Sequence, residues 1–203
     1  MTKLNPLVFA SVLGLIVLSV SLLVVGNVRA AGSDHVRWDI VDFISFAPNT
    51  FRAGGAAFAT AANPSTLNIR LTGSGTFVAP ASGGPSNAVT GGGTWETFNG
   101  AVLTGSRTYS VTGLASWQFA NFFSPVPIDL IGNISEAASG NVILRIRYSD
   151  GSDGILGVGC HGPGAPDGIA EGVIATKDFV TYWNPNPPLP GVNLNRTVFH
   201  VTK

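Results

Sequence analysis

The sequence predicts an all-β fold, an antiparallel β-sandwich or partly closed β-barrel of about nine strands with no significant helix. Apolar and polar residues alternate with a period of two in residues 67–77 and 109–119, as in half-buried strands. A Thr-Gly-x-Gly-Thr-aromatic segment occurs twice, at residues 72–77 and 90–95. Because Gly, Pro and Asn separate these segments, we expect three consecutive strands in an antiparallel meander.

Glycines gather on the expected inner face of this meander. A glycine inside a strand is less favourable than alanine by about 0.5–1 kcal/mol, so the groove that several glycines leave needs a filler. We expect aromatic side chains such as Trp38, Trp117 or Phe58 to cover them, with a bound ligand as the alternative. The glycines concerned are Gly73, Gly75, Gly91, Gly93 and Gly113.

Residues 1–30 have the pattern of a secretory signal peptide. Lys3 gives a basic start, residues 7–25 are almost wholly apolar, and Val28 and Ala30 are small residues at the expected cleavage site. The apolar stretch approaches the ~20 residues that span a bilayer, so retention as an N-terminal membrane anchor is the alternative. We therefore expect a secreted, extracellular or periplasmic protein, with a membrane partner only if this segment is retained.

Residues 31–203 are expected to form a single all-β domain. Without Lys3 and Arg29 the chain has nine basic and eleven acidic side chains, a net charge of −2, which does not favour nucleic acid. Cys160 is the only cysteine, so stability must come from the β core and not from an intramolecular disulfide.

The N-terminal half of this domain begins with an alternating strand. Residues 35–46 carry it, and a break in the alternation indicates a bulge near Val41. Residues 54–62 form a run of small residues, and Asn and Pro in residues 63–66 predict a turn. The two segments on either side of this turn are expected to form a hairpin.

The C-terminal half contains the clearest hairpin. Residues 142–148 and 155–160 are strands joined by an Asp/Gly turn. Before them, residues 121–140 are expected to be a long loop with a short helical turn.

The last segments are predicted from alternation and proline content. Residues 169–183 are expected to form one long strand interrupted near Lys177 and Asp178, and residues 195–202 the closing strand. The Pro-rich residues 184–191 are expected to be a stiff loop that cannot be a strand.

Residues 157–162 match the G-x-G-x-x-G dinucleotide pattern, but the prolines that follow exclude the helix this pattern requires. Cys160 and His161 are candidates for a nucleophile and its base. On alternation the two side chains point to opposite faces, which favours a buried, inert thiol at Cys160. Asp167 and Glu171 are the remaining catalytic candidates, and a solvated carboxylate is the default interpretation of Glu171.

Three further sets of residues suggest binding. Asp150 and Asp153 can supply oxygens to a metal ion such as calcium, although a plain hairpin turn explains them better. Tyr182 and Trp183 end a strand beside the Pro-rich loop and are candidates for stacking on a ligand. Asn133 and Asn195 fit the N-glycosylation acceptor pattern, which matters only if the host glycosylates its secreted proteins.

Three functions follow as hypotheses. The first is a non-catalytic structural or interaction module, because no acid, base and nucleophile converge in the sequence. The second is a module that binds a small apolar molecule or a carbohydrate. The third is an enzyme with a site near residues 160–171. No cofactor is expected; the expected partners are a small apolar molecule, a carbohydrate or another extracellular protein, and not a nucleic acid.

Overall fold

The computed structural model describes residues 33–202, so the predicted secretory segment lies outside the described residues. Within them the regular structure is almost entirely β-strand, as predicted, with one 3₁₀ turn at Ile134–Glu136. No helix in this part of the chain is long and apolar enough to cross a bilayer. The strands are β1 (Asp34–Phe46), β2 (Asn49–Ala53), β3 (Ala57–Thr60), β4 (Leu67–Leu71), β5 (Ser74–Ala79), β6 (Val89–Asn99), β7 (Val102–Phe122), β8 (Ile128–Asp129), β9 (Ala137–Tyr148), β10 (Asp153–Cys160), β11 (Gly172–Lys177), β12 (Val180–Tyr182), β13 (Asn184–Pro185) and β14 (Thr197–Thr202).

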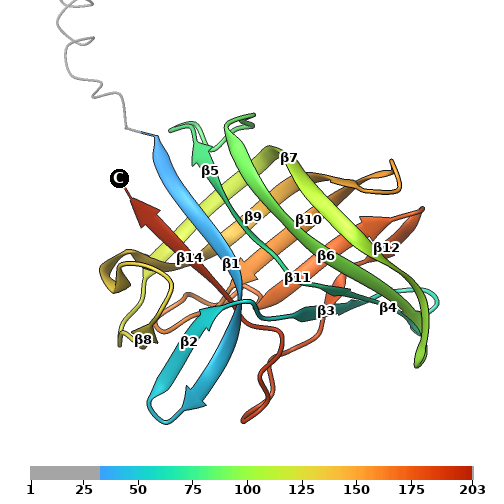
Figure 1. The fold of residues 1–203 in the computed structure, drawn as a ribbon. Coiled ribbons are helices and arrows are strands. Elements are labelled where there is room, and N and C mark those ends of the chain that lie inside the picture. Colours follow the sequence, from blue (N-terminus) through green and yellow to red (C-terminus); the bar gives the residue numbers. More distant parts are fainter. Residues whose placement is uncertain (1–32, 203) are drawn as a thin grey trace, which may run out of the picture. The chain divides into compact units, whose positions relative to one another are not determined.

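Six strands close into a barrel, in the order β9, β14, β1, β5, β6 and β7, with β7 paired back to β9 (Figure 1). All these pairs are antiparallel. The sheet continues outside the ring from β9 into β10, β11 and β12, and from β6 into β4, β3 and β13. The structure therefore has the predicted antiparallel all-β class, and of the two expected forms, a sandwich or a partly closed barrel, it has the barrel, with a closed ring. Residues 33–202 contain fourteen strands, several of them short, where about nine were expected.

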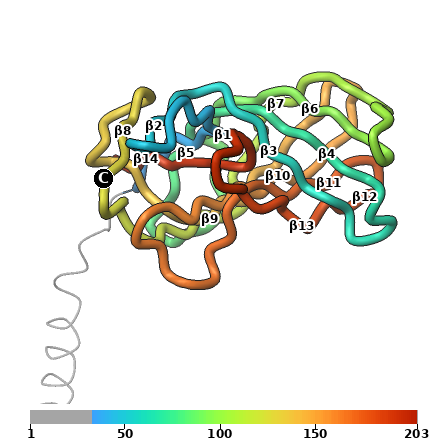
Figure 2. The backbone as a smooth tube through the Cα atoms, turned by 90° about the horizontal axis from the view of Figure 1, so that it is seen from below, coloured from blue at the N-terminus to red at the C-terminus, as the bar shows by residue number. Residues whose placement is uncertain are grey.

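A second, small sheet extends from one end of the barrel. β1 pairs with β5 as far as Asp39 and with β14 as far as Ile40, and from Val41 onward it pairs with β2. β2 in turn pairs in parallel with β8. In Figure 2, β2 and β8 lie at one end of the molecule, and β4, β11, β12 and β13 at the other. The change of partner occurs at Val41, close to the predicted bulge.

The two copies of the glycine repeat lie side by side. β5 pairs with β6 so that Gly75 is opposite Gly91, and the hydroxyls of Thr76 and Thr90 are 2.7 Å apart. Residues 67–77, expected as one strand, are divided at Thr72 and Gly73 into β4 and β5. Both pieces pair with the longer β6, so the predicted meander is present with one additional break.

Trp38 covers two of the five glycines on the meander. A Cβ atom built on Gly75 would lie 2.9 Å from Trp38 Nε1, and one on Gly73 would lie 3.1 Å from Trp38 Cη2. The backbone is closer still at Gly75, where the nearest atom to such a Cβ is the carbonyl oxygen of Thr90, and at Gly73 the nearest atom is the hydroxyl of Tyr109. Gly91 and Gly93 face the carbonyl groups of Ser74 and Thr72, and a Cβ on Gly113 would have 3.6 Å to its nearest neighbour. Trp38 thus contributes cover at two positions, while close approach of the backbone explains Gly75, Gly91 and Gly93.

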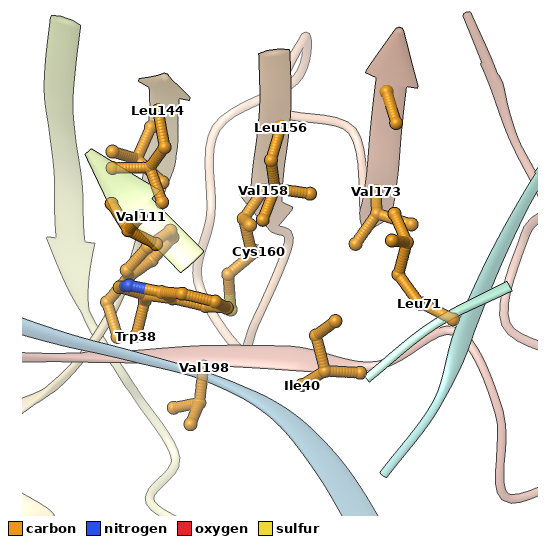
Figure 3. Close-up of a cluster of buried hydrophobic side chains, with 14 of the residues drawn as sticks. Trp38, Ile40, Leu71, Val111, Leu144, Leu156, Val158, Cys160, Val173 and Val198 are labelled. Carbon is orange, nitrogen blue, oxygen red and sulfur yellow. The ribbon is translucent and has the colours of Figure 1, made fainter. Parts of the chain in front are cut away.

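Apolar side chains fill the space between the strands. Figure 3 shows Trp38 extending toward side chains of the strands on the other side, among them Val111, Leu144 and Cys160. Trp38 and Leu144 are 0% exposed. The same cluster continues to Leu71, Leu156 and Val173. The interior is therefore a packed core.

Three segments of the C-terminal half differ from expectation. Residues 169–183 are not one long strand: Asp178 and Phe179 have φ angles of 49° and 66°, and the chain reverses there between β11 and β12. The Pro-rich segment was expected to contain no strand, but Asn184 and Pro185 form the short strand β13. This strand pairs with β3 at the edge of the sheet. β9 begins at Ala137, earlier than predicted, and shortens the expected loop.

Candidate functional site

A pocket of about 360 Å³ opens on the outside of the barrel, between the β1–β2 hairpin and the loops that follow β10 and precede β14. We call it the side pocket. Its walls are mainly apolar: Val41, Phe43, Phe51, Phe123, Pro127, Pro163 and Pro188. Its polar lining residues are Asn49, His161, Glu171, Arg196 and Thr197.

The register of the β1–β2 hairpin produces the apolar wall. Phe43 is opposite Phe51, and their ring centroids are 5.7 Å apart. Phe46 stacks on Phe43 from the outer side, with ring centroids 5.5 Å apart. Aromatic pairs at such distances stabilise each other beyond simple burial. The hairpin therefore presents a preformed aromatic surface to the pocket.

Glu171 joins two segments at the polar side of the pocket. Its Oε1 accepts hydrogen bonds from the Thr197 backbone N–H (2.6 Å) and hydroxyl (3.1 Å), and its Oε2 accepts from the His161 backbone N–H at 2.5 Å. Burial raises the pKa of Glu171 to about 7, although these hydrogen bonds and the nearby charge of Arg196 favour the ionised form. This carboxyl group therefore exchanges its proton near neutral pH and is not the solvated carboxylate assumed by default.

His161 lines the same pocket with its ring oriented by the backbone. Nδ1 lies 2.8 Å from the carbonyl oxygen of Ile169. Since a carbonyl can only accept, Nδ1 carries the hydrogen, and Nε2 of the neutral ring is an acceptor. His161 and Glu171 thus supply acceptor and acid–base groups on one side of an apolar pocket.

Arg196 adds a guanidinium group to this side. Its Cζ lies 4.8 Å from the Phe43 ring centroid and 5.4 Å from that of Phe46, distances typical of cation–π contacts. Nη2 donates to the Leu189 carbonyl at 3.1 Å, whereas the buried Nε has no hydrogen-bond partner. None of the ion pairs formed within residues 33–202 includes Arg196.

Two of the catalytic candidates lie away from the pocket. Cys160 is 1% exposed, and its thiol donates to the Thr197 carbonyl at 3.1 Å. Burial raises the pKa of this thiol well above its usual value, so it is a poor nucleophile. Its predicted divergence from the exposed His161 is confirmed, and Asp167 is exposed outside the side pocket.

Asp150 and Asp153 form ion pairs with basic side chains of the protein itself. Asp150 pairs with the buried Lys177 at 2.7 Å and accepts from Ser152 in the turn. Asp153 pairs with Arg147 at 2.8 Å. No cluster of three metal-ligating side chains occurs among residues 33–202. The arrangement is that of a hairpin turn.

Tyr182 and Trp183 do not form a common binding surface. Tyr182 is buried in the core, and Trp183 is 57% exposed. Neither residue lines the side pocket.

A buried polar cluster that sequence reasoning did not identify lies on the outer wall of the barrel. His200 Nε2 is 2.5 Å from Asp129 Oδ2, and both side chains are buried. Asp129 also accepts hydrogen bonds from the backbone of Ile131 and Gly132, and Arg37 forms a two-point ion pair with Asp39. The His200–Asp129 contact attaches the β8 segment to β14 of the barrel.

The fold and the side pocket define a class of protein, a closed antiparallel β-barrel with a ligand-sized pocket on its outer side. Comparison of the chain with protein-family models, with curated proteins and with solved structures gave no significant match.

Proposed function

We propose that the protein is a binding module for a small, largely apolar molecule, and that its site is the side pocket. The observation that supports this most strongly is the pocket itself, about 360 Å³ with Phe43, Phe51 and Phe123 in its walls. Small-molecule sites are typically concave and apolar, with volumes of about 300–1,000 Å³ and a few polar groups on one side.

Several observations favour this function over the other hypotheses. The barrel core is packed, and the side pocket differs from the other surface concavities, which have similar volumes of about 350–470 Å³, in having three phenylalanines in its walls. Catalysis by a thiolate at Cys160 is disfavoured, because this thiol is buried away from the pocket. The apolar walls also favour an aromatic or aliphatic ligand over a carbohydrate. Export of the domain remains a separate prediction.

Filling the pocket tests the proposal. Asn49 is an exposed pocket residue, so Asn49→Trp places a large ring at the pocket without removing a core side chain. We expect the wild type to bind the neutral probe N-phenyl-1-naphthylamine, seen as increased probe fluorescence, and Asn49→Trp to weaken binding about tenfold or more, which corresponds to about 1.4 kcal/mol.

Thr50→Trp is the matched control, because Thr50 follows Asn49 in β2 and lies outside the pocket lining. This variant should bind the probe as the wild type does. Equal binding by all three proteins, or no binding by the wild type, would contradict the proposed function.

A further inference from the structure

We propose that the ligand of the side pocket is an organic carboxylate, with its apolar part against Phe43, Phe51 and Phe123 and its carboxylate paired with Arg196. This inference rests on the proposed function and adds the charge and head group of the ligand. It follows from the lack of an ion-pair partner for Arg196, from the orientation of its guanidinium group and from the hydrogen bonds that Glu171 already accepts.

Arg196 lies at a pocket wall without a carboxylate partner. Arg37, Arg52, Arg70 and Arg147 each pair with an Asp or Glu side chain at 2.6–2.9 Å, whereas none of the ion pairs within residues 33–202 includes Arg107, Arg145 or Arg196. Of these three, Arg196 is the one that lines the side pocket, where it is partly buried. A partly buried charge without an ion-pair partner is less well solvated than an exposed one, so a ligand that supplies an anion gains an interaction that the protein leaves unmade.

The guanidinium group is also held in place before a ligand arrives. The rings of Phe43 and Phe46 lie against it, and the Leu189 carbonyl accepts one of its hydrogens. A planar group that is already oriented loses little freedom when it forms two parallel hydrogen bonds with a carboxylate. Phe43 contacts both this group and the pocket, so the apolar part of a ligand would lie beside its charged part.

Glu171 lies in the same pocket and would at first sight repel an anion. Its two oxygens, however, already accept hydrogen bonds from the backbone N–H groups of His161 and Thr197. Burial also raises its pKa to about 7, so it can take up a proton when an anion binds. A cationic ligand would instead face the unpaired Arg196, and a neutral ligand would leave that charge unpaired. The carboxylate is therefore the head group that the pocket fits best.

Two probes of the same shape test this proposal. Naphthalene-1-carboxylate and naphthalene-1-carboxamide differ in charge and share the same ring, and isothermal titration calorimetry measures both affinities. We expect the wild type to bind the carboxylate about tenfold or more tightly than the carboxamide, the usual effect of a charge-assisted pair. Arg196→Met keeps an apolar stem beside Phe43 and should lose this preference, so that it binds the two probes with similar affinity.

Arg107→Met is the charge-matched control, because Arg107 is exposed on β7 outside the side pocket. It should keep the wild-type preference. Thermal unfolding of each variant establishes that it is folded, and the comparison of the two probes on the wild type needs no variant.

Equal affinity of the wild type for both probes, or an unchanged preference in Arg196→Met, would overturn the carboxylate proposal while carboxamide binding still supports the proposed function. If neither probe binds the wild type, both the carboxylate and the proposed binding function are wrong.

Discussion

At the scale of single residues, Glu171 makes the stability of the protein depend on pH. Burial raises its pKa from 4.5 to about 7 in the folded protein. Between these values the folded protein keeps a proton that the unfolded chain has released, so the folded state binds more protons. The contribution that protonated Glu171 makes to the free energy of unfolding is therefore complete below pH 4.5 and is lost as the pH rises toward 7.

The variant Glu171→Gln tests this prediction. Between pH 4.5 and 7 the free energy of unfolding of the wild type should fall more steeply than that of the variant, which cannot titrate at this position. Urea denaturation at several pH values measures both slopes. Glutamine has one acceptor oxygen where glutamate has two, so its NH₂ group cannot replace the oxygen that accepts from the His161 N–H, and the variant is less stable at every pH. For this reason the slopes are compared and not the absolute stabilities. Asp167→Asn, at an exposed site, should retain the wild-type slope, and parallel curves for wild type and Glu171→Gln would contradict the assignment.

At the scale of elements, glycines allow the backbone of β6 to lie close to β5 and to the residues that join β4 to β5. A Cβ on Gly93 would overlap the backbone carbonyl of Thr72, which cannot rotate away as a side chain can. We expect Gly93→Ala to lower the free energy of unfolding by about 1–3 kcal/mol, the usual range for overpacking.

Gly113→Ala provides the comparison within the same meander. Its Cβ would be 3.6 Å from the nearest atom, an ordinary contact, so its effect should stay within about 0.5 kcal/mol. Chemical denaturation of the two variants measures the difference. Equal stability of both would show that backbone approach is not the reason for glycine at position 93.

The strands could be predicted where alternation alone determines them. Residues 142–148 and 155–160 form the predicted hairpin because each has one buried face. The prediction fails where the chain changes partner or direction without a strong turn sequence. The interruption near Lys177 and Asp178 was predicted, but the reversal of the chain there was not, because Phe179 adopts a positive φ that a bulky side chain rarely takes.

At the scale of the whole molecule, the candidate site could be predicted only in part. His161 and Glu171 were recognisable as polar residues near a Gly/Pro loop, and the structure joins them by a 2.5 Å hydrogen bond. Phe43 and Arg196 were not recognisable, because they meet only after the barrel closes between β1 and β14 and β1 then turns to β2. A pocket built by contacts so distant in sequence leaves no local pattern.

The most direct test is a crystal structure of the protein with N-phenyl-1-naphthylamine bound. Phe43 and Phe51 pack against each other in the wall of the pocket, so the rings of the probe should lie between Phe43, Phe51 and Phe123, with the barrel core unchanged. Rings found within the barrel core, or at another surface with the side pocket empty, would contradict the proposal that this pocket is the binding site.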